Sequence, residues 1–476
     1  MQNRVLFGRR VIYVDVAEIT PANVVDVLRK AYTTHLRNKS EIEYLYGYYK
    51  GRQPIIDRKK EVRPEINNTI VENRANEIVS FKVGYLMGEP VQYVSRGDDQ
   101  AVSQSVTRLN DYMASEDKST KDKELAEWMH IAGLGYRMTL PDAAADVELD
   151  EAPFEIYTLD PRTTFVAYFN TLGNPAAMSV NYFTNEDKKT VFCIYTDNMY
   201  YEVHDRDLML AEPQVLGIPI VEYPLNNARI GAFEVVLPLL DAINATDSNR
   251  LDGVEQFIQA LMLFHNVDIS SKDYAKLRQE GAIKFKDIDP QLKAEIKYLT
   301  AELNQTQTQT LIDHMYDTVL TICGMPNRNG GSSTSDTGSA VIMRDGWSAA
   351  EARAKDTELM FKKSEKSFLK LVLRICRDLA GLSLNLFSFE ARFTRRNYEN
   401  IVEKANVLTT MLNNPKIAPQ LAFTHCGMFS DPQIAYAISM EYMKEQEAKA
   451  AALQKKEGEG NDPGNHPVTE SGEGDQ

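Results

Sequence analysis

The sequence is poor in the residues that build metal sites and disulfide frameworks. Its four cysteines, Cys193, Cys323, Cys376 and Cys426, lie far apart and form no CxxC pair. This spacing indicates neither a zinc site nor a disulfide framework, so we expect free, buried thiols in a reducing compartment. The seven histidines form no HExxH motif and no Cys/His pair at ligand spacing. The sequence therefore predicts no metal site.

Long apolar runs are also missing. No stretch reaches the roughly 18 apolar residues that a membrane helix needs. Residues 1–16 contain only a short apolar run, which arginines interrupt, and this is not the pattern of a secretory signal. We therefore expect a soluble, intracellular protein that has no membrane partner.

Positive charge is in deficit. The chain has 53 Lys and Arg against 68 Asp and Glu, which gives a net charge of −15 and an isoelectric point of about 5.1. A protein that grips nucleic acid normally has a basic surface, because contacts to phosphates supply most of the affinity. This chain either has no nucleic-acid partner or meets DNA without holding it. A conduit requires the second behaviour, because tight binding would stop DNA from sliding.

Catalytic motifs are missing as well. A P-loop has the pattern GxxxxGK[ST], whereas GSSTSDTG at residues 331–338 has a different spacing and no lysine. The GLG at residues 133–135 lacks the third glycine of a dinucleotide site, and no GxSxG nucleophile elbow is present. No pair of carboxylates is marked as catalytic. From these patterns we expect no cofactor and no enzyme.

The composition is that of a folded protein, with 43% hydrophobic and 25% charged residues. Its 476 residues favour roughly two to four structural units. Periodic apolar positions predict helices, and these lie at residues 20–50, 67–86, 121–131, 231–264, 301–322 and 339–379, with two or three more within 397–450. Runs of β-branched and aromatic residues predict strands, and these lie at residues 154–159, 163–169, 178–183, 191–196, 199–203 and 382–393. The predicted class is α+β and mainly helical, with an antiparallel sheet domain at 91–226.

Several segments are unusually polar. The centre of the helix expected at 231–264, residues 245–250, is polar on all sides, so we expect it to pack against neighbours in an assembly or to span between domains. Residues 265–300 form a small, nearly neutral module, with strands expected at 267–270 and 282–285 and a helix at 272–280. Residues 327–338 are small and polar, which predicts a mobile loop. The acidic segment 453–476 is predicted to be disordered.

Short motifs in one order give the chain a resemblance to a known family. They are NNTI and YLMGEPV at residues 67–70 and 85–91, IPIVEYPLNN at 218–227, GAFE and LDAIN at 231–234 and 240–244, and FTRRN and SDP at 393–397 and 430–432. In this order the motifs resemble phage portal proteins of the siphovirus type, from viruses of Gram-positive bacteria. Each motif alone is weak, but together they cover roughly residues 35–445.

The resemblance implies a ring-forming portal fold with wing, stem, clip and crown. The implied parts are the wing at 1–226, the first stem helix at 227–264, the clip at 265–300, the second stem helix at 301–326, the tunnel loop at 327–338, a long helix and strand that complete the wing at 339–395, and the crown at 396–452. The tip of the tunnel loop departs from the family, because it lacks the apolar or bulky residue expected there.

The resemblance also implies a function. The chain is expected to be a non-enzymatic subunit of a homo-oligomeric ring, a dodecamer in the family, through which double-stranded viral DNA enters and leaves the capsid. The implied partners are the terminase large subunit, the head-tail adaptor, and the major capsid and scaffolding proteins. The implied location is the capsid portal vertex of the virion, after assembly in the host bacterial cytoplasm.

The same mapping gives two groups of site residues. Those expected to face DNA are Arg328, Asn329, Gly330, Gly331, Ser332, Ser333, Thr334, Ser335 and Arg344, of which the two arginines are the stronger candidates. Those expected to dock partners at the clip are Lys272, Lys276, Arg278, Lys284 and Lys286. Two alternatives remain open. The chain could be another structural virion protein, or an enzyme of unrecognised type that uses the sheet domain.

Overall fold

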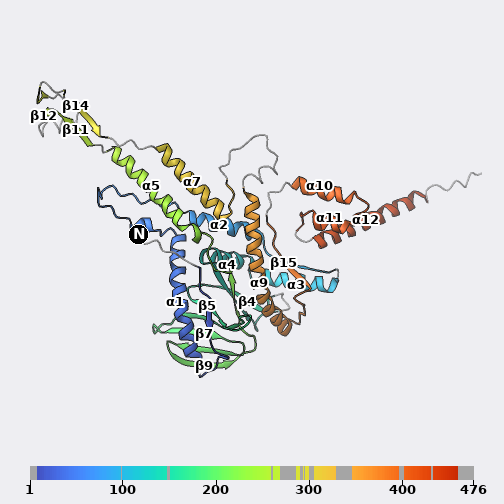
Figure 1. The fold of residues 1–476 in the computed structure, drawn as a ribbon. Coiled ribbons are helices and arrows are strands. Elements are labelled where there is room, and N and C mark those ends of the chain that lie inside the picture. Colours follow the sequence, from blue (N-terminus) through green and yellow to red (C-terminus); the bar gives the residue numbers. More distant parts are fainter. Residues whose placement is uncertain are drawn as a thin grey trace, which may run out of the picture. The chain divides into compact units, whose positions relative to one another are not determined.

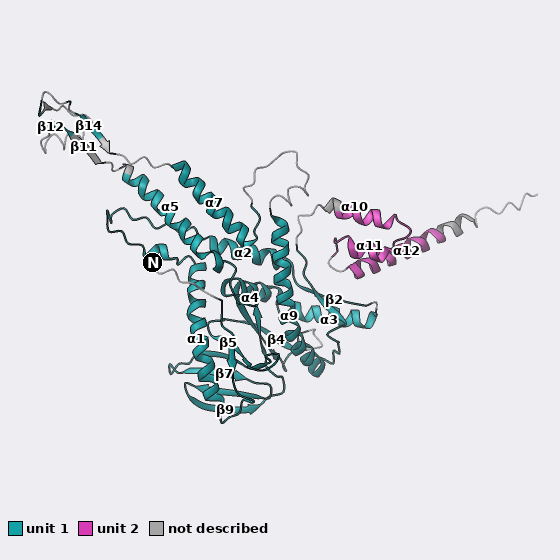
Figure 2. Cartoon of the chain, viewed as in Figure 1, with its two compact units in different colours: residues 1–395 teal, residues 396–476 magenta. Residues whose placement is uncertain are grey.

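The computed structural model describes residues 8–97, 99–146, 151–258, 261–268, 286–289, 293, 295–299, 305–327, 346–395, 401–429 and 432–458. The chain divides into two compact units, residues 1–395 and 396–476 (Figure 2). Long helices occur together with several small sheets (Figure 1), so the predicted α+β class is confirmed.

All but one of the helices described in the first unit overlap predicted helices; the exception, at Gln100–Ser115, was not predicted. The helices are α1 (Val24–Tyr49), α2 (Arg74–Leu86), α3 (Gln100–Ser115), α4 (Lys118–Ala132), α5 (Leu237–Ile258), α7 (Gln305–Cys323) and α9 (Trp347–Ala380). Short 3-10 turns at Pro54–Asp57 and Glu234–Val236 precede α2 and α5 in the chain.

Six strands form the larger sheet, in the order β1-β5-β6-β7-β8-β9. They are β1 (Ile12–Val14), β5 (Thr164–Phe169), β6 (Ala176–Thr184), β7 (Thr190–Tyr195), β8 (Met199–His204) and β9 (Asp207–Pro213). The four predicted strands among them are confirmed, with bounds that differ by at most two residues. The pairs from β5 to β9 are antiparallel, and β1 is parallel to β5. Helix α1 packs on this sheet through Val24, Val27 and Leu28.

A second sheet has the order β10-β3-β4 and joins the main helices. Its strands are β3 (Leu134–Pro141), β4 (Phe154–Leu159) and β10 (Ile220–Pro224). Residues of α3, α4, α9 and this sheet share one apolar core. The sequence predicted β4 but missed β3. The first six residues of β3 are all buried, so the strand lacks the alternation of a half-exposed strand.

Helices α1 and α2 begin later than their sequence predicts. The helix expected from residue 20 begins at Val24. The Asn23 side chain accepts a hydrogen bond from the Thr20 N–H at 2.8 Å and donates one to the Glu18 carbonyl at 2.9 Å, which stabilises a turn before the helix. The helix expected from residue 67 begins at Arg74, where the Asn73 side chain accepts from the Asn76 N–H.

The helix expected to reach residue 264 ends earlier. Strand β11 (Leu261–His265) follows α5 and pairs antiparallel with β14 (Glu295–Leu299), while β12 (Val267–Asp268) pairs with β13 (Lys286–Asp287). Helices α5 and α7 lie side by side and lead to these strands (Figure 1). Of the other elements predicted in this module, the helix at 272–280 and the strand at 282–285 lie outside the described residues.

The last elements of the first unit are a long helix and a short strand. Helix α9 begins at Trp347, and the part of the predicted helix before Gly346 lies outside the described residues. The strand expected at 382–393 is shorter, because β15 comprises only Phe389–Arg392, which pairs with β2 (Gln92–Ser95).

The second unit contains the three helices that the sequence allowed. They are α10 (Ile401–Leu412), α11 (Pro419–His425) and α12 (Pro432–Gly458). The prediction of a disordered tail from residue 453 is wrong for its first residues, because α12 continues to Gly458. Residues 459–476 lie outside the described part. Across the described residues of both units, none of the helices has the length and apolarity needed to span a bilayer.

Candidate functional site

Almost all of the predicted site residues lie outside the described residues. This holds for Arg328, Asn329, Gly330, Gly331, Ser332, Ser333, Thr334, Ser335 and Arg344, and for Lys272, Lys276, Arg278 and Lys284. The remaining residue, Lys286, lies in β13, opposite Asp268 of β12 in the strand register. The structure therefore defines the surroundings of the predicted DNA-facing segment rather than the segment itself.

The two ends of segment 328–345 are close together. A Cβ atom placed on Gly346 would lie 3.6 Å from the Met325 carbonyl oxygen and 3.7 Å from the Pro326 Cα. Gly324 (φ +61°) and Gly346 (φ +81°) have left-handed conformations, which other residues rarely adopt. The described residues on either side of segment 328–345, at the end of α7 and the start of α9, thus lie side by side.

Helix α2 helps to hold this point in place. The Lys82 ammonium donates a hydrogen bond to the Cys323 carbonyl oxygen at 2.7 Å, which ties the last turn of α7 to α2. On the other side, the Trp347 ring lies about 6 Å from the rings of Phe81 and Tyr85, centroid to centroid. Both ends of segment 328–345 are therefore anchored on one helix.

The polar centre of α5 has a partner within the chain. Three buried side chains, Asn244, Ser248 and Asp252, recur every fourth residue along one face of the helix. They accept hydrogen bonds from the backbone N–H groups of Glu72 (2.9 Å), Ile70 (2.9 Å) and Asn68 (2.8 Å), respectively.

The spacings of the two partners match. Four helical residues rise about 6 Å, and two extended residues rise about 6.6 Å. Alternate N–H groups of an extended segment can therefore meet every fourth side chain of a helix. We call these three hydrogen bonds the α5 ladder. Because they hold residues 68–72 in an extended form, they explain why α2 begins at Arg74 rather than at residue 67.

The α5 ladder gives part of the polar helix centre a partner within the chain. The sequence led us to expect that residues around 245–250 contact a neighbouring copy or span between domains. Asp252 is also paired with Lys60 at 3.0 Å and with Arg58 at 3.1 Å, and Arg250 donates to Gln305 on α7 at 2.6 Å. Much of the polar surface of α5 is therefore used inside the chain.

The α5 ladder can be tested with a matched pair of variants. Ser248 and Thr246 both donate to the carbonyl four residues earlier, but only Ser248 also accepts an N–H from residue 70. We expect Ser248→Ala to lower the free energy of unfolding by about 1–3 kcal/mol, because the Ile70 N–H loses its acceptor. Thr246→Val should stay within about 0.5 kcal/mol. Denaturant unfolding, with hydrogen exchange at the Ile70 amide, measures both, and equal effects of the two variants would contradict the α5 ladder.

A group of four charged side chains lies buried where α4, α9 and β3 meet. It consists of Lys118, Asp122, Arg137 and Glu365, whose side chains are at most 3% exposed. We call it the buried charge network. Lys118 contacts Asp122 at 2.7 Å and Glu365 at 3.0 Å, and Arg137 contacts both Asp122 and Glu365. Two cations thus balance two carboxylates within one closed cluster.

Two tyrosines complete the environment of Glu365. The hydroxyls of Tyr93 on β2 and Tyr223 on β10 donate to its two carboxylate oxygens at 2.6 and 2.7 Å. Burial alone would raise the pKa of Glu365, but the Lys118 and Arg137 charges and these hydrogen bonds hold the pKa below its ordinary value. Burial and the adjacent Glu365 charge raise the pKa of both tyrosines, which keeps them protonated as donors. The network therefore fastens α9 to α4 and to both flanking sheets.

Sequence reasoning missed the buried charge network, although α9 carried a signal. Glu365 lies four residues after Phe361 and three before Phe368, on the apolar face of the helix, and both rings are fully buried. A carboxylate on an apolar stripe requires buried partners. The sequence could not supply those partners, because they come from other elements far away in the chain.

The expectation of unpaired thiols is confirmed. All four cysteines are free, and Cys323, Cys376 and Cys426 are buried. Burial raises the pKa of the Cys323 thiol to about 11, so this side chain is unreactive at neutral pH. A search of the described residues finds no group of three or more His, Cys, Asp or Glu side chains arranged to hold a metal ion.

Comparison with known proteins adds one positive finding. The family model described as phage portal protein, SPP1 Gp6-like, matches residues 28–460. This range includes most of α1 and all of α5, α7, α9 and the three helices described in the second unit, so nearly all of the described elements fall within it. No curated protein gives a significant match.

Proposed function

Because the chain belongs to the SPP1 Gp6-like family of phage portal proteins, we propose that it forms the ring channel through which a tailed phage packages and ejects its DNA. The family is structural rather than enzymatic. The subunit would occupy the portal vertex of the capsid. The observation that carries the proposal is the family match across residues 28–460, which spans both compact units.

The parts of a portal subunit are assigned along the chain as follows. The wing comprises residues 1–226 and 339–395, the stem 227–264 and 301–326, the clip 265–300, the tunnel loop 327–338 and the crown 396–452. Helices α5 and α7 support the stem assignment, because they lie side by side and lead to the paired strands β11 and β14. An inserted module at the end of a helix pair is what a clip requires.

Segment 328–345 is proposed to reach the DNA. Pro326 and Gly346, which lie on either side of it, are close together, so the segment could project from the body without changing the packing of α7 or α9. Arg328 and Arg344 flank its small, polar tip and are the proposed phosphate contacts. A loop with few cations on a chain of net charge −15 would guide DNA without arresting it.

The action of the ring would be mechanical and steric. The terminase large subunit would hydrolyse ATP. Both this subunit and the head-tail adaptor would dock at the clip, through Lys272, Lys276, Arg278, Lys284 and Lys286. The major capsid and scaffolding proteins would surround the wing. Assembly would take place in the host bacterial cytoplasm, in a ring that is a dodecamer in the family.

Apolar side chains on the helix pair support contacts between copies. Leu251 and Val254 on α5 are 38% and 41% exposed, and Leu311 on α7 is 51% exposed. Since the α5 ladder uses the polar side of α5 within the chain, these apolar side chains are available for a neighbouring helix pair. An enzyme in the sheet domain is the weaker alternative, because the buried charge network is closed and internally balanced.

Sedimentation of the purified chain tests assembly. We expect a discrete species many times heavier than the 53.8 kDa subunit, because each copy presents the same surfaces to two neighbours in a ring. Analytical ultracentrifugation over a range of protein and salt concentrations measures it. A monomer under every condition would contradict the proposed function.

A further inference from the structure

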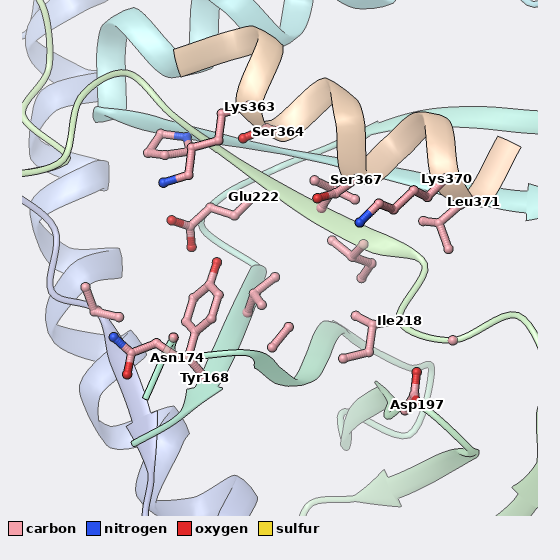
Figure 3. A pocket seen from close by; sticks show the side chains of 18 of the residues that line it. Tyr168, Asn174, Asp197, Ile218, Glu222, Lys363, Ser364, Ser367, Lys370 and Leu371 are labelled. Atoms are coloured by element: carbon pink, nitrogen blue, oxygen red, sulfur yellow. The ribbon is translucent and has the colours of Figure 1, made fainter. Parts of the chain in front are cut away.

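A large pocket lies between α9 and the two sheets. It has a volume of about 690 Å³ and is lined by residues of α9, β5 and β10 and by the segment before β10. In Figure 3, the side chains of Lys363, Ser367 and Lys370 extend from α9 into this space, and those of Tyr168 and Glu222 approach from the sheet side. The pocket belongs neither to the proposed tunnel nor to the clip.

The pocket carries more positive than negative charge. Four cations line it, namely Arg229, Lys363, Lys370 and Arg374, against the two carboxylates of Asp197 and Glu222. Arg229 is paired with Glu222 at 2.7 Å, and Arg374 donates to the Leu216 carbonyl oxygen at 2.8 Å. Within the described chain, Lys363 and Lys370 form no ion pair. Two exposed ammonium groups therefore remain for an outside partner, although the chain as a whole has a charge of −15.

The arrangement on α9 is that of a small anion-binding strip. Lys363 and Lys370 are seven residues apart, so they lie two turns apart on one face of the helix, about 10 Å along its axis. Ser364 and Ser367 lie between them on the same pocket wall. Two ammonium groups with hydroxyls between them are suited to two carboxylates on one extended segment, since each carboxylate can accept from both donor types.

We infer that this pocket receives an acidic segment of a second copy of the chain in the assembled ring. The inference rests on the proposed function, which brings identical acidic chains side by side. Charge complementarity supports a second copy as the partner, because 68 acidic residues give every neighbour carboxylates to present. The contact would add an electrostatic constraint on how neighbouring subunits are placed.

Zero-length cross-linking tests the inference on the unmodified protein. Rings are assembled from equal amounts of unlabelled and ¹⁵N-labelled chains, and a carbodiimide then joins lysine amines to carboxylates that touch them. Peptides of mixed isotope content that link Lys363 or Lys370 to an Asp or Glu identify the neighbour's segment. Rings in which both lysines give only same-chain links, or none, would overturn the inference.

A charge-reversal pair supplies the second measurement. In K363E/K370E we expect the protein concentration needed for half-assembly to rise by about tenfold or more, with a weaker dependence on salt. The control K366E reverses one lysine charge on the same helix, but Lys366 lines a different pocket, beside Phe387, so assembly should be unchanged. Equal assembly of all three proteins would overturn the inference. Failure of the unmodified chain to form rings would instead contradict the proposed function.

Discussion

Deletion of residues 329–337 should reduce the yield of DNA-filled capsids to that of particles without a portal, while ring assembly stays normal. The deletion removes the proposed DNA-facing tip but none of the described contacts. The nine residues left of segment 328–345 reach up to about 30 Å when extended. The gap between Pro326 and Gly346 is far smaller, since a Cβ on Gly346 would touch the Pro326 Cα at 3.7 Å. The shortened segment therefore closes without strain on α7 or α9.

Nuclease protection of packaged DNA, measured beside sedimentation of the rings, separates the two effects. Deletion of residues 465–473 from the acidic C-terminal segment is the matched control and should leave packaging intact. The double variant R328A/R344A, with the segment at full length, should weaken packaging if phosphate contacts matter. Normal yields of filled capsids from the 329–337 deletion would contradict the tunnel-loop assignment.

Loss of the Glu365 carboxylate should be the most damaging single change to stability. In Glu365→Leu, the cations of Lys118 and Arg137 would face only Asp122, and the hydroxyls of Tyr93 and Tyr223 would lose their acceptor. Removing one partner from a buried ion pair costs about 3–5 kcal/mol. The cost arises because no side chain in the cluster is more than 3% exposed, so water cannot replace the lost partner.

Two further variants isolate the charge imbalance as the cause. Asp356→Asn removes an exposed carboxylate from the same helix and should change the free energy of unfolding by no more than about 0.5 kcal/mol. The pair Glu365→Leu/Lys118→Met restores neutrality and should recover part of the loss. Denaturant unfolding of the four proteins measures these differences. A Glu365→Leu variant as stable as Asp356→Asn would show that the network does not hold α9 in place.

The elements that the sequence predicts best are those whose pattern depends on local geometry. The strands between residues 154 and 204 alternate or carry β-branched and aromatic side chains, and they lie where predicted. Strand β3 was missed because it is buried on both faces and contains the Arg137 of the charge network. Tertiary contacts, rather than local propensity, decide such a strand.

In the polar centre of α5, the pattern was visible in the sequence but its partner was not. Asn244, Ser248 and Asp252 have the spacing of one helix face, and that spacing was readable from the sequence. Their partner is a backbone segment about 180 residues earlier, and backbone N–H groups leave no signature in a sequence. The sequence therefore pointed to an outside partner, although part of this polar face is satisfied within the chain.

The candidate site was predictable only in part. The small, polar composition of residues 327–338 pointed to a loop, and the order of the family motifs pointed to its role. The approach of Pro326 to Gly346 could not be predicted, because it depends on how α2 anchors α7 and α9.

An electron cryomicroscopy reconstruction of the purified assembly tests the central claim most directly. We predict a closed ring with an axial channel, in which α5 and α7 of neighbouring copies pack side by side and residues 328–345 line the narrowest part of the channel. A closed ring with these residues on its outer surface would contradict their proposed contact with DNA. The absence of any ring with an axial opening would contradict the portal function itself.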